Sequence, residues 1–305
     1  MLAIVAPGQG AQKPGMLSAW LELPGVADRL SVLSEGTGLD LTRLGTTAGA
    51  DEIKDTAVTQ PLVVATAVLA AGRLDAPADT VCAGHSVGEL AAAALAGVLD
   101  DATAVELAAV RGRAMGEACA VTPTSMAAVM NPDTDAVLAL LAERDLVGAN
   151  VNGGGQIVAA GASNAIADLV ATPPAGMRVI GLPVAGAFHT AYMAPAADQF
   201  ARVVAGVIPA DPRGPLLSNS DGSVVGSGAR YLDLLVAQIT SPVRWDRCLA
   251  TFAELGVTGV LELPPAGTLV GLVRRELRGV ATLALKSPDD LGPAIAFIAE
   301  HGGPA

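Results

Sequence analysis

The stretch Gly84-His85-Ser86-Val87-Gly88 constrains the fold of this chain more than any other part of the sequence. An apolar run precedes it and an alanine-rich run follows it, which predicts a buried strand, a sharp turn and a helix. A serine on such a turn has strained backbone geometry and exposes its hydroxyl, while the two glycines let strand and helix backbones approach closely. The helix N-terminus favours the negative charge that develops when a hydroxyl attacks a carbonyl. We therefore predict a nucleophilic Ser86 rather than an ordinary turn.

The composition indicates a folded protein with a large core, since 51% of its 305 residues are hydrophobic and only 16% are charged. No apolar run is long and continuous enough to span a bilayer, so we expect no membrane association. The net charge of −12 argues against nucleic-acid binding, which needs a basic surface. The first residues show a strand pattern without the basic region of a secretion signal, so we expect a cytoplasmic protein.

Three cysteines, Cys82, Cys119 and Cys248, are odd in number and far apart in the sequence. We interpret them as free thiols in a reducing compartment. No cysteine and histidine residues have the spacing of a metal site, so we expect no metal.

Predicted strands and helices alternate over most of the chain, which is typical of an α/β fold with a mostly parallel sheet between helical layers. Between residues 124 and 186 the order is strand, helix, strand, strand, helix, strand, which predicts a small ferredoxin-like α+β subdomain. We therefore expect a large domain from residues 1–123 and 187–305, with the subdomain 124–186 inserted into it. A glycine-rich hairpin turn is expected at Asn152-Gly153-Gly154-Gly155.

The individual elements follow from hydrophobic periodicity and from glycine and proline positions. Strands of the large domain are expected at residues 2–6, 80–83, 216–219, 257–263 and 281–285. Its helices are expected at residues 28–37, 61–73, 88–99, 101–118, 229–239, 247–255 and 267–277. Within the subdomain, strands are expected at 125–130, 147–160 (two strands) and 177–184, with helices at 133–144 and 163–170.

Only three histidines could serve as a base for the serine. His301 lies near the C-terminus and is expected to be solvated, and His85 is expected to have a packing role. His189 follows the last strand of the insert, and we predict that it is the general base. No carboxylate is obviously placed to orient its ring. Asp100, Asp101 and Asp168 remain candidates for this role, and a backbone carbonyl could orient the ring equally well.

Arg111 lies in the middle of a largely apolar predicted helix. A buried arginine needs an anionic partner, whereas an exposed one is only a solvated charge. Both interpretations of Arg111 stay open at this point.

Several ordered motifs together resemble the malonyl-CoA:acyl carrier protein transacylase family over nearly the whole chain. The motifs are Pro7-Gly8-Gln9-Gly10-Ala11-Gln12, Gly84-His85-Ser86-Val87-Gly88-Glu89, Arg111-Gly112-Arg113, Ala187-Phe188-His189, Ser241-Pro242-Val243-Arg244-Trp245 and Pro265-Ala266-Gly267-Thr268-Leu269. The resemblance implies a hydrolase-like α/β domain with a ferredoxin-like insert.

The resemblance also implies roles for individual residues. Ser86 would carry the malonyl group as an ester, and His189 would move the proton. The backbone carbonyl of Gln238 would orient His189 in place of a carboxylate. The backbone N–H groups of Gln9 and Val87 would form the oxyanion hole.

Two further residues would set the choice of substrate. Arg111 would bind the free malonyl carboxylate through two charge-assisted hydrogen bonds, so malonyl should react in preference to acetyl. Phe188 is the residue that this family pairs with malonyl rather than methylmalonyl.

The implied reaction moves malonyl from malonyl-CoA to the phosphopantetheine thiol of acyl carrier protein, in a ping-pong reaction of fatty-acid biosynthesis. No cofactor is expected, because the CoA thioester is a substrate, and we expect a monomer. The dense basic cluster Arg274, Arg275, Arg278 and Lys286 would meet the carrier protein or CoA phosphates, unless its charges only offset a helix dipole. Alternatives are a polyketide acyltransferase, a serine hydrolase or thioesterase, and a non-catalytic scaffold.

Overall fold

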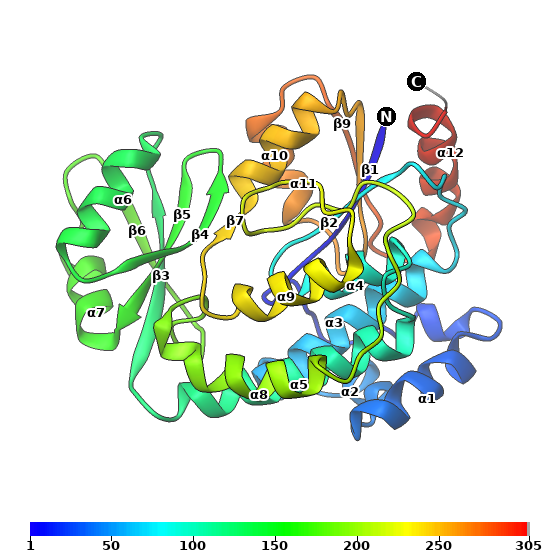
Figure 1. The fold of residues 1–305 in the computed structure, drawn as a ribbon, viewed down its shortest axis with the longest axis horizontal. Helices are drawn as coiled ribbons and strands as arrows, with labels where there is room; N and C mark the ends of the chain where they lie inside the picture. Colours follow the sequence, from blue (N-terminus) through cyan, green and yellow to red (C-terminus); the bar gives the residue numbers. More distant parts are fainter. Residues whose placement is uncertain (304–305) are drawn as a thin grey trace.

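The computed structural model describes residues 1–303 as two sheets surrounded by helices (Figure 1). The sheet of the large domain has four parallel strands in the order β2-β1-β8-β9. These strands are β1 (Leu2–Ala6), β2 (Val81–Gly84), β8 (Gly259–Glu262) and β9 (Ala281–Ala284). Every residue of β1 is buried, as expected for a central parallel strand covered on both faces.

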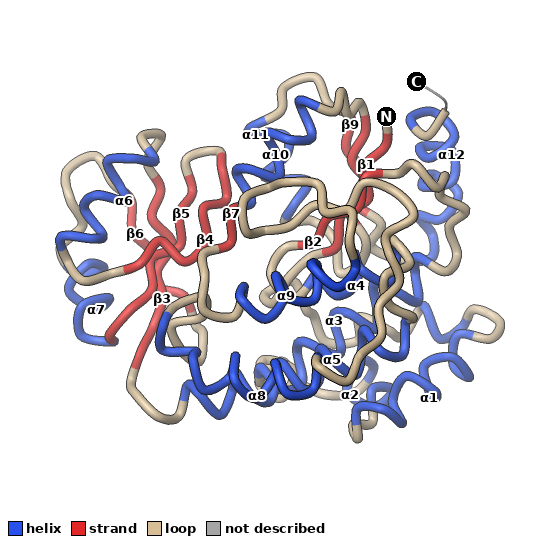
Figure 2. Tube along the Cα trace, viewed as in Figure 1, coloured by secondary structure: helices blue, strands red, loops and turns tan. Residues whose placement is uncertain are grey.

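Helices cover both faces of this sheet (Figure 2). The helices of the large domain are α1 (Val26–Thr37), α2 (Leu41–Thr46), α3 (Thr56–Ala71), α4 (Gly88–Leu95), α5 (Asp101–Cys119), α8 (Ala194–Val204), α9 (Gly228–Gln238), α10 (Trp245–Glu254), α11 (Leu269–Glu276) and α12 (Leu291–His301). Three short 3₁₀ helices, η1 (Trp20–Glu22), η2 (Ala191–Met193) and η3 (Pro288–Asp290), complete the large domain.

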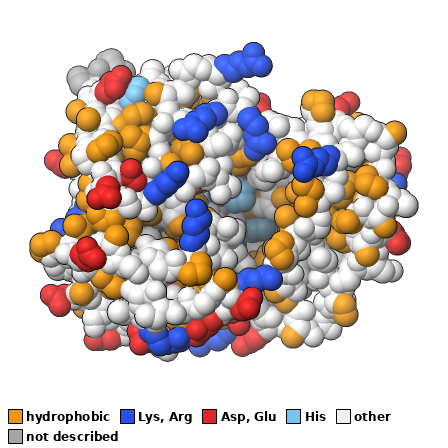
Figure 3. Space-filling view, turned by 180° about the vertical axis from the view of Figure 1, so that it is seen from behind, with side chains coloured by type: hydrophobic (Ala, Val, Ile, Leu, Met, Phe, Trp, Pro, Cys, Tyr) orange, Lys and Arg blue, Asp and Glu red, His pale blue; other side chains and the backbone are white. Residues whose placement is uncertain are grey.

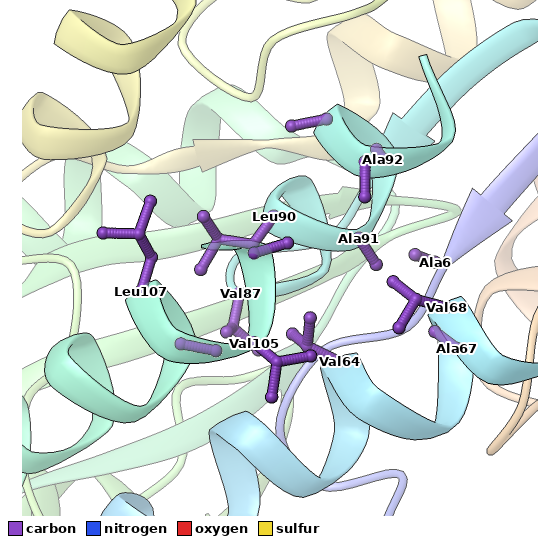
Figure 4. Packing of buried hydrophobic residues seen from close by; sticks show 14 of the residues in the cluster. Ala6, Val64, Ala67, Val68, Val87, Leu90, Ala91, Ala92, Val105 and Leu107 are labelled. Atoms are coloured by element: carbon purple, nitrogen blue, oxygen red, sulfur yellow. The ribbon is translucent and has the colours of Figure 1, made fainter. Parts of the chain in front are cut away.

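One hydrophobic cluster holds the nucleophile helix α4 in place. Helix α4 packs against α3 and α5 through small and branched apolar side chains (Figure 4). The contributing side chains include Val64 and Val68 of α3, Leu90 and Ala91 of α4, and Val105 and Leu107 of α5. A second cluster, which contains Trp245 and Phe252, lies under α10 and α11. The helix is thus fixed by close packing, which resists displacement of the turn that precedes it.

The small sheet is formed mainly by residues 124–182 and has the order β6-β3-β5-β4-β7. Its elements are β3 (Thr124–Met130), α6 (Thr134–Glu143), β4 (Val147–Gly153), β5 (Gln156–Ala162), α7 (Ser163–Ala171) and β6 (Arg178–Leu182). These four strands pair antiparallel in the ferredoxin-like order. The hairpin turn lies at Gly153–Gly155, where all three glycines have positive φ.

One strand of the small sheet comes from outside the predicted insert. The two-residue strand β7 (Val243–Arg244) pairs parallel with β4, and Asn150 is opposite Val243. The sequence pattern did not indicate this strand, because two residues are too short to show alternation. A segment of the large domain, β7, therefore covers the outer edge of β4.

Several predicted boundaries were wrong. Helix α3 begins at Thr56, capped by the Asp55 carboxylate, so Pro61 lies inside the helix and not in its first turn. Residues 216–219 form no strand; Leu216 makes only an isolated bridge to Cys82 beside β2. The helices α2, α8 and α12 were not predicted.

The prediction for His301 was also wrong. Its side chain is 11% exposed, its Nδ1 lies 3.0 Å from the Thr258 hydroxyl, and its ring packs on Phe297. Helix α12 ends beside Gly259 at the start of β8, which leaves this residue only partly exposed.

Over residues 1–303, none of the helices combines the length and apolar character that a bilayer crossing requires. Nor do the described residues group three histidine, cysteine or carboxylate side chains in a way that could hold a metal ion.

Candidate active site

The turn between β2 and α4 places Ser86 in the left-handed region, with φ of 54°. The flanking glycines are required because the backbone segments touch there. A Cβ on Gly84 would lie 2.0 Å from the carbonyl carbon of Gly88, and a Cβ on Gly88 would lie 2.3 Å from the Ala6 carbonyl oxygen. The backbone is therefore strained at Ser86, and positions 84 and 88 leave no room for any side chain larger than that of glycine.

Ser86 and His189 form a hydrogen-bonded pair, with 2.7 Å between Oγ and Nε2. The other ring nitrogen, Nδ1, lies 2.8 Å from the backbone carbonyl oxygen of Gln238. Because a carbonyl only accepts, Nδ1 carries the hydrogen and Nε2 is free to accept the serine proton. His189 thus has the geometry of a general base.

No carboxylate takes part in this pair. Asp100 caps α5 through the Thr103 amide, Asp101 pairs with Arg29, and Asp168 lies in the subdomain helix α7. The three carboxylates that the sequence left open are therefore placed elsewhere, and the carbonyl of Gln238 is what orients the ring.

The surroundings of His189 keep its ring neutral. Burial lowers the pKa of His189 to about 3, and the Arg111 charge adds to this shift. The hydrogen bond to the Gln238 carbonyl opposes it. A neutral imidazole at pH 7 is the form that can take a proton from Ser86.

Arg111 is buried beside the serine, so the solvated alternative is excluded. It is 1% exposed, and Nη2 lies 3.3 Å from the Ser86 Oγ. Its guanidinium also donates to the side-chain oxygens of Gln60 and Gln238, at 2.8 Å each. Among residues 1–303 nothing accepts from its Nε. Burial lowers the pKa of Arg111 to about 10, so it stays cationic at pH 7.

The Gly-rich loop after β1 packs directly on the turn. A Cβ on Gly8 would lie 2.7 Å from the His85 carbonyl oxygen. The loop side chain of Gln9 donates to Thr56 at 3.2 Å, which fixes its path. Within the described chain, the backbone N–H groups of Gln9 and Val87 donate to no protein acceptor. Two free donors on this loop and at the start of α4 suit an oxyanion hole.

A pocket of about 240 Å³ opens above Ser86, between the large domain and the small sheet. Figure 3 shows the hollow on this face, with histidine side chains inside it and lysine and arginine side chains around it. Phe188 lines the pocket and is 7% exposed. Met126, Leu182 and Leu272 form apolar walls of the pocket, while Gln60, His85 and Asn150 add polar groups to its lining.

His85 does more than the packing role expected for it. It lines the pocket, and its Nε2 lies 2.9 Å from Oδ1 of Asn152 in the small sheet. Its ring also meets Trp245 edge-on. The residue before the nucleophile therefore connects the turn to the subdomain hairpin.

Sequence reasoning missed three polar residues around the pair. Glu89 is buried in α4 and accepts from the Asn219 backbone N–H and from Gln238 Nε2. The Asn219 side chain accepts from the Ser86 N–H at 2.8 Å, and Gln60 holds Arg111. The available signal was a glutamate in an otherwise apolar helix, which must find hydrogen-bond donors.

Two of the four predicted docking cations, Arg274 and Arg275, lie in the last turn of α11. Arg274 donates to the Thr282 hydroxyl at 2.7 Å, on the β9 side of α11. The Arg275 stem packs on the hairpin turn, 3.1 Å from where a Cβ of Gly154 would lie, and this turn follows Asn152 of the pocket lining. Arg278 and Lys286 follow α11 and β9, and across residues 1–303 none of the four forms a salt bridge.

A parallel α/β sheet that carries a strained serine, a carbonyl-oriented histidine and a buried arginine defines a serine acyltransferase. In agreement, the family described as the acyl transferase domain matches residues 4–288. The chain is 55% identical over 296 residues to the malonyl CoA-acyl carrier protein transacylase of Mycobacterium tuberculosis, covering 95% of this chain and 98% of the relative. It is 34% identical to the Escherichia coli protein of that name, covering 96% and 98%.

Solved structures agree with the sequence relatives. The crystal structure of MCAT from Mycobacterium tuberculosis matches with a TM-score of 0.93 and 53% identity, covering 97% of this chain and 99% of that one. A structure described as a type II PKS acyl-carrier protein in complex with its malonyl-transacylase matches with a TM-score of 0.90 and 31% identity, covering 97% and 99%. The chain belongs to the malonyl CoA-acyl carrier protein transacylase family.

Proposed function

We propose that this protein transfers malonyl from malonyl-CoA to the phosphopantetheine thiol of acyl carrier protein, through a malonyl ester on Ser86. One observation carries the proposal: the buried Arg111 Nη2 lies 3.3 Å from the Ser86 Oγ. A malonyl ester on that oxygen has its free carboxylate two bonds from the ester carbonyl, within reach of the guanidinium. An uncharged acyl group would have no carboxylate to pair with this buried cation.

The first half-reaction uses the geometry of the pair. Ser86 Oγ attacks the thioester carbonyl while His189 Nε2 takes its proton. The N–H groups of Gln9 and Val87 stabilise the oxyanion. The C–S bond then breaks, and His189 gives the proton to the CoA sulfur, which leaves a malonyl ester on Ser86.

The second half-reaction reverses these roles. The incoming phosphopantetheine thiol gives its proton to His189 and attacks the ester carbonyl. The C–O bond breaks and Ser86 recovers the proton, so the enzyme returns to its starting state. No step needs a metal or cofactor, and we propose that none is used.

Substrate choice follows from two side chains, Arg111 beside the Ser86 hydroxyl and Phe188 in the pocket lining. Arg111 would bind the malonyl carboxylate with charge-assisted hydrogen bonds of about 1.5–3 kcal/mol each. Phe188 would reject a branching methyl, because overpacking costs about 1–3 kcal/mol. Arg111 therefore favours malonyl over acetyl, and Phe188 favours malonyl over methylmalonyl.

The partner is proposed to be an acidic acyl carrier protein that docks at the pocket mouth near Arg275. Because this chain has a net charge of −12, docking of an acidic partner requires a local basic surface. We further propose that the protein acts as a monomer in the cytoplasm, in fatty-acid biosynthesis. Transfer to the carrier protein of a polyketide pathway uses the same site chemistry.

The test is the intact-protein mass after brief mixing with malonyl-CoA. We expect a malonyl-sized gain that is absent in Ser86→Ala and nearly absent with acetyl-CoA. Carrier protein with its phosphopantetheine arm should then discharge the ester faster than water does, while the same carrier without the arm should not. Release of free CoA without an adduct would instead identify a hydrolase or thioesterase. Neither adduct nor CoA release would reject malonyl-CoA as the substrate.

A further inference from the structure

The mechanism above leaves one buried acidic side chain, Glu89, unused. Burial raises the pKa of this carboxyl group to about 8, although the Asn219 N–H and the Arg111 charge oppose the shift. Glu89 lies in the first turn of α4 and is 1% exposed. Its Oε1 accepts from the Asn219 backbone N–H and its Oε2 from Gln238 Nε2, each at 2.5 Å. Within residues 1–303 it forms no salt bridge. A buried carboxylate without a direct cation costs stability, so its position calls for an explanation.

The side-chain amide of Gln238 lies between this carboxylate and the arginine of the site. Its Oε1 accepts from Arg111 Nη2 at 2.8 Å, while its Nε2 donates to Glu89. A guanidinium only donates, and each Glu89 oxygen accepts from its neighbour, so a single orientation of the amide satisfies both sides. Nε2 also lies 3.3 Å from the Ser86 carbonyl oxygen and 3.2 Å from Asn219 Oδ1, so Glu89, at 2.5 Å, is the nearest of three acceptors that hold this orientation.

A line of polar contacts thus runs from Glu89 through Gln238 to Arg111, which ends beside the Ser86 Oγ. We propose that Glu89 is a positioning residue for malonyl recognition, which acts through the Gln238 amide to fix the Arg111 guanidinium beside the acyl group. The proposal rests on the proposed function and deepens it. Glu89 itself touches neither substrate nor the reacting atoms.

A positioning role and a purely structural role have different consequences. A structural Glu89 would support α4 and the turn, so its loss would slow all acylation of Ser86 to a similar extent. A positioning Glu89 would affect only acyl groups that carry a carboxylate. The ratio of malonyl to neutral acyl transfer therefore separates the two roles.

The experiment measures Ser86 acylation by malonyl-CoA and by p-nitrophenyl acetate, whose acetyl group has no carboxylate. In Glu89→Gln we expect kcat/KM for malonyl-CoA to fall about tenfold to a hundredfold, as for loss of one hydrogen bond to a charged group. The p-nitrophenyl acetate reaction should change less than about threefold. Glu89→Asp, which keeps the carboxyl group but withdraws it from Gln238, should reduce the same ratio by a smaller factor and serves if Glu89→Gln fails to fold.

A double-mutant cycle tests the route through Gln238. Gln238→Met removes the amide but keeps the backbone carbonyl that orients His189. If Glu89 acts through this amide, Glu89→Gln in the Gln238→Met background should lower the malonyl rate by less than about twofold more. If the two substitutions act independently, so that their fold-losses in the malonyl rate multiply in the double variant, the proposal is overturned.

The chain offers a matched control in Glu262, which is fully buried and accepts backbone N–H groups of Gly267, Leu269 and Val270. Glu262→Gln should lower Tm without changing the ratio between the two substrates. A Glu89→Gln protein with the wild-type ratio, or with equal losses for both substrates, would overturn the proposal. Failure of the wild-type protein to form a malonyl ester would instead reject the proposed function.

Discussion

His189 Nδ1 donates to the backbone carbonyl oxygen of Gln238 at 2.8 Å, where a serine hydrolase commonly has a carboxylate. Gln238 is the last residue of α9, so its carbonyl lacks an intrahelical partner and lies at the negative end of the helix dipole. The same carbonyl also accepts from the Ser241 N–H at 3.2 Å. A neutral acceptor orients the ring without the full charge that would raise its pKa.

The low pKa of His189 predicts an unusual pH profile for acylation. Because the ring stays neutral well below pH 6.5, kcat/KM for malonyl-CoA should be nearly constant from pH 7 to pH 5. With an unperturbed histidine the rate would fall about twenty-fivefold over that range. The measurement is the rate of ester formation against pH, with buffer controls. A bend near pH 6.5 would contradict the prediction.

The same group should make the folded state less stable in acid. The folded pKa is about 3 and the unfolded value is 6.5, so the unfolded chain binds more protons between these values. Stability from this group is therefore fully present above pH 6.5 and is lost as the pH falls towards 3. From pH 7 to 5 the loss is about 2 kcal/mol. Denaturant unfolding of wild type and His189→Gln should show this loss only in the wild type.

Arg111→Ala should remove the preference for a charged acyl group. We expect malonyl acylation to fall about a hundredfold or more, while p-nitrophenyl acetate changes far less. Gln60 and Gln238 lose their donor, so the free energy of unfolding should fall by about 1–3 kcal/mol per unpaired group. Paired kinetics and Tm measurements check both effects. Equal losses for the two substrates would show that Arg111 does not contact the carboxylate.

Phe188→Ser should widen the pocket beside the base. The phenyl ring lines the pocket, and its loss leaves room for a branching methyl. The ratio of methylmalonyl to malonyl acylation should rise about tenfold or more, in line with relief of about 1–3 kcal/mol of overpacking. Intact mass with each CoA ester measures the ratio. An unchanged ratio would show that the branching methyl of methylmalonyl does not contact Phe188.

Two glycine substitutions should have opposite effects on stability. Gly88→Ala would force a Cβ to 2.3 Å from the Ala6 carbonyl, so folding should be strongly impaired. Gly116 lies inside α5 with nothing within 4 Å of its potential Cβ. Gly116→Ala should therefore stabilise the protein by about 0.5–1 kcal/mol. Soluble yield and Tm of both variants test this, and a normally stable Gly88→Ala would contradict the described contact.

Charge reversal at Arg275 tests the docking surface. Its stem packs on the hairpin turn that follows Asn152 of the pocket lining, so Arg275→Glu should raise KM for carrier protein about threefold or more at low salt. The effect should diminish as salt rises. Arg202→Glu, in the last turn of α8, is the matched reversal away from the pocket and should have little effect. An unchanged KM in Arg275→Glu would move the docking surface elsewhere.

The alternation of apolar segments was enough to predict the parallel sheet and the antiparallel insert. The turn at Ser86 was predictable because the small residues around it leave few other conformations. Strand β7 and the long-range polar contacts of Glu89 were not, because they depend on segments that meet only in the folded chain. Pro61 misled the prediction of α3, since proline is tolerated inside a helix when packing compensates for the missing hydrogen bond.

The pairing of β7 with β4 limits how freely the small subdomain can be exchanged between related proteins. A graft of residues 124–186 alone would leave Asn150 and Val151 without the backbone partners that Val243 and Arg244 provide. The uncovered edge would be available for pairing with another chain. A chimaera intended to change the pocket roof should therefore carry the 243–244 segment together with the insert, as two separated pieces of one unit.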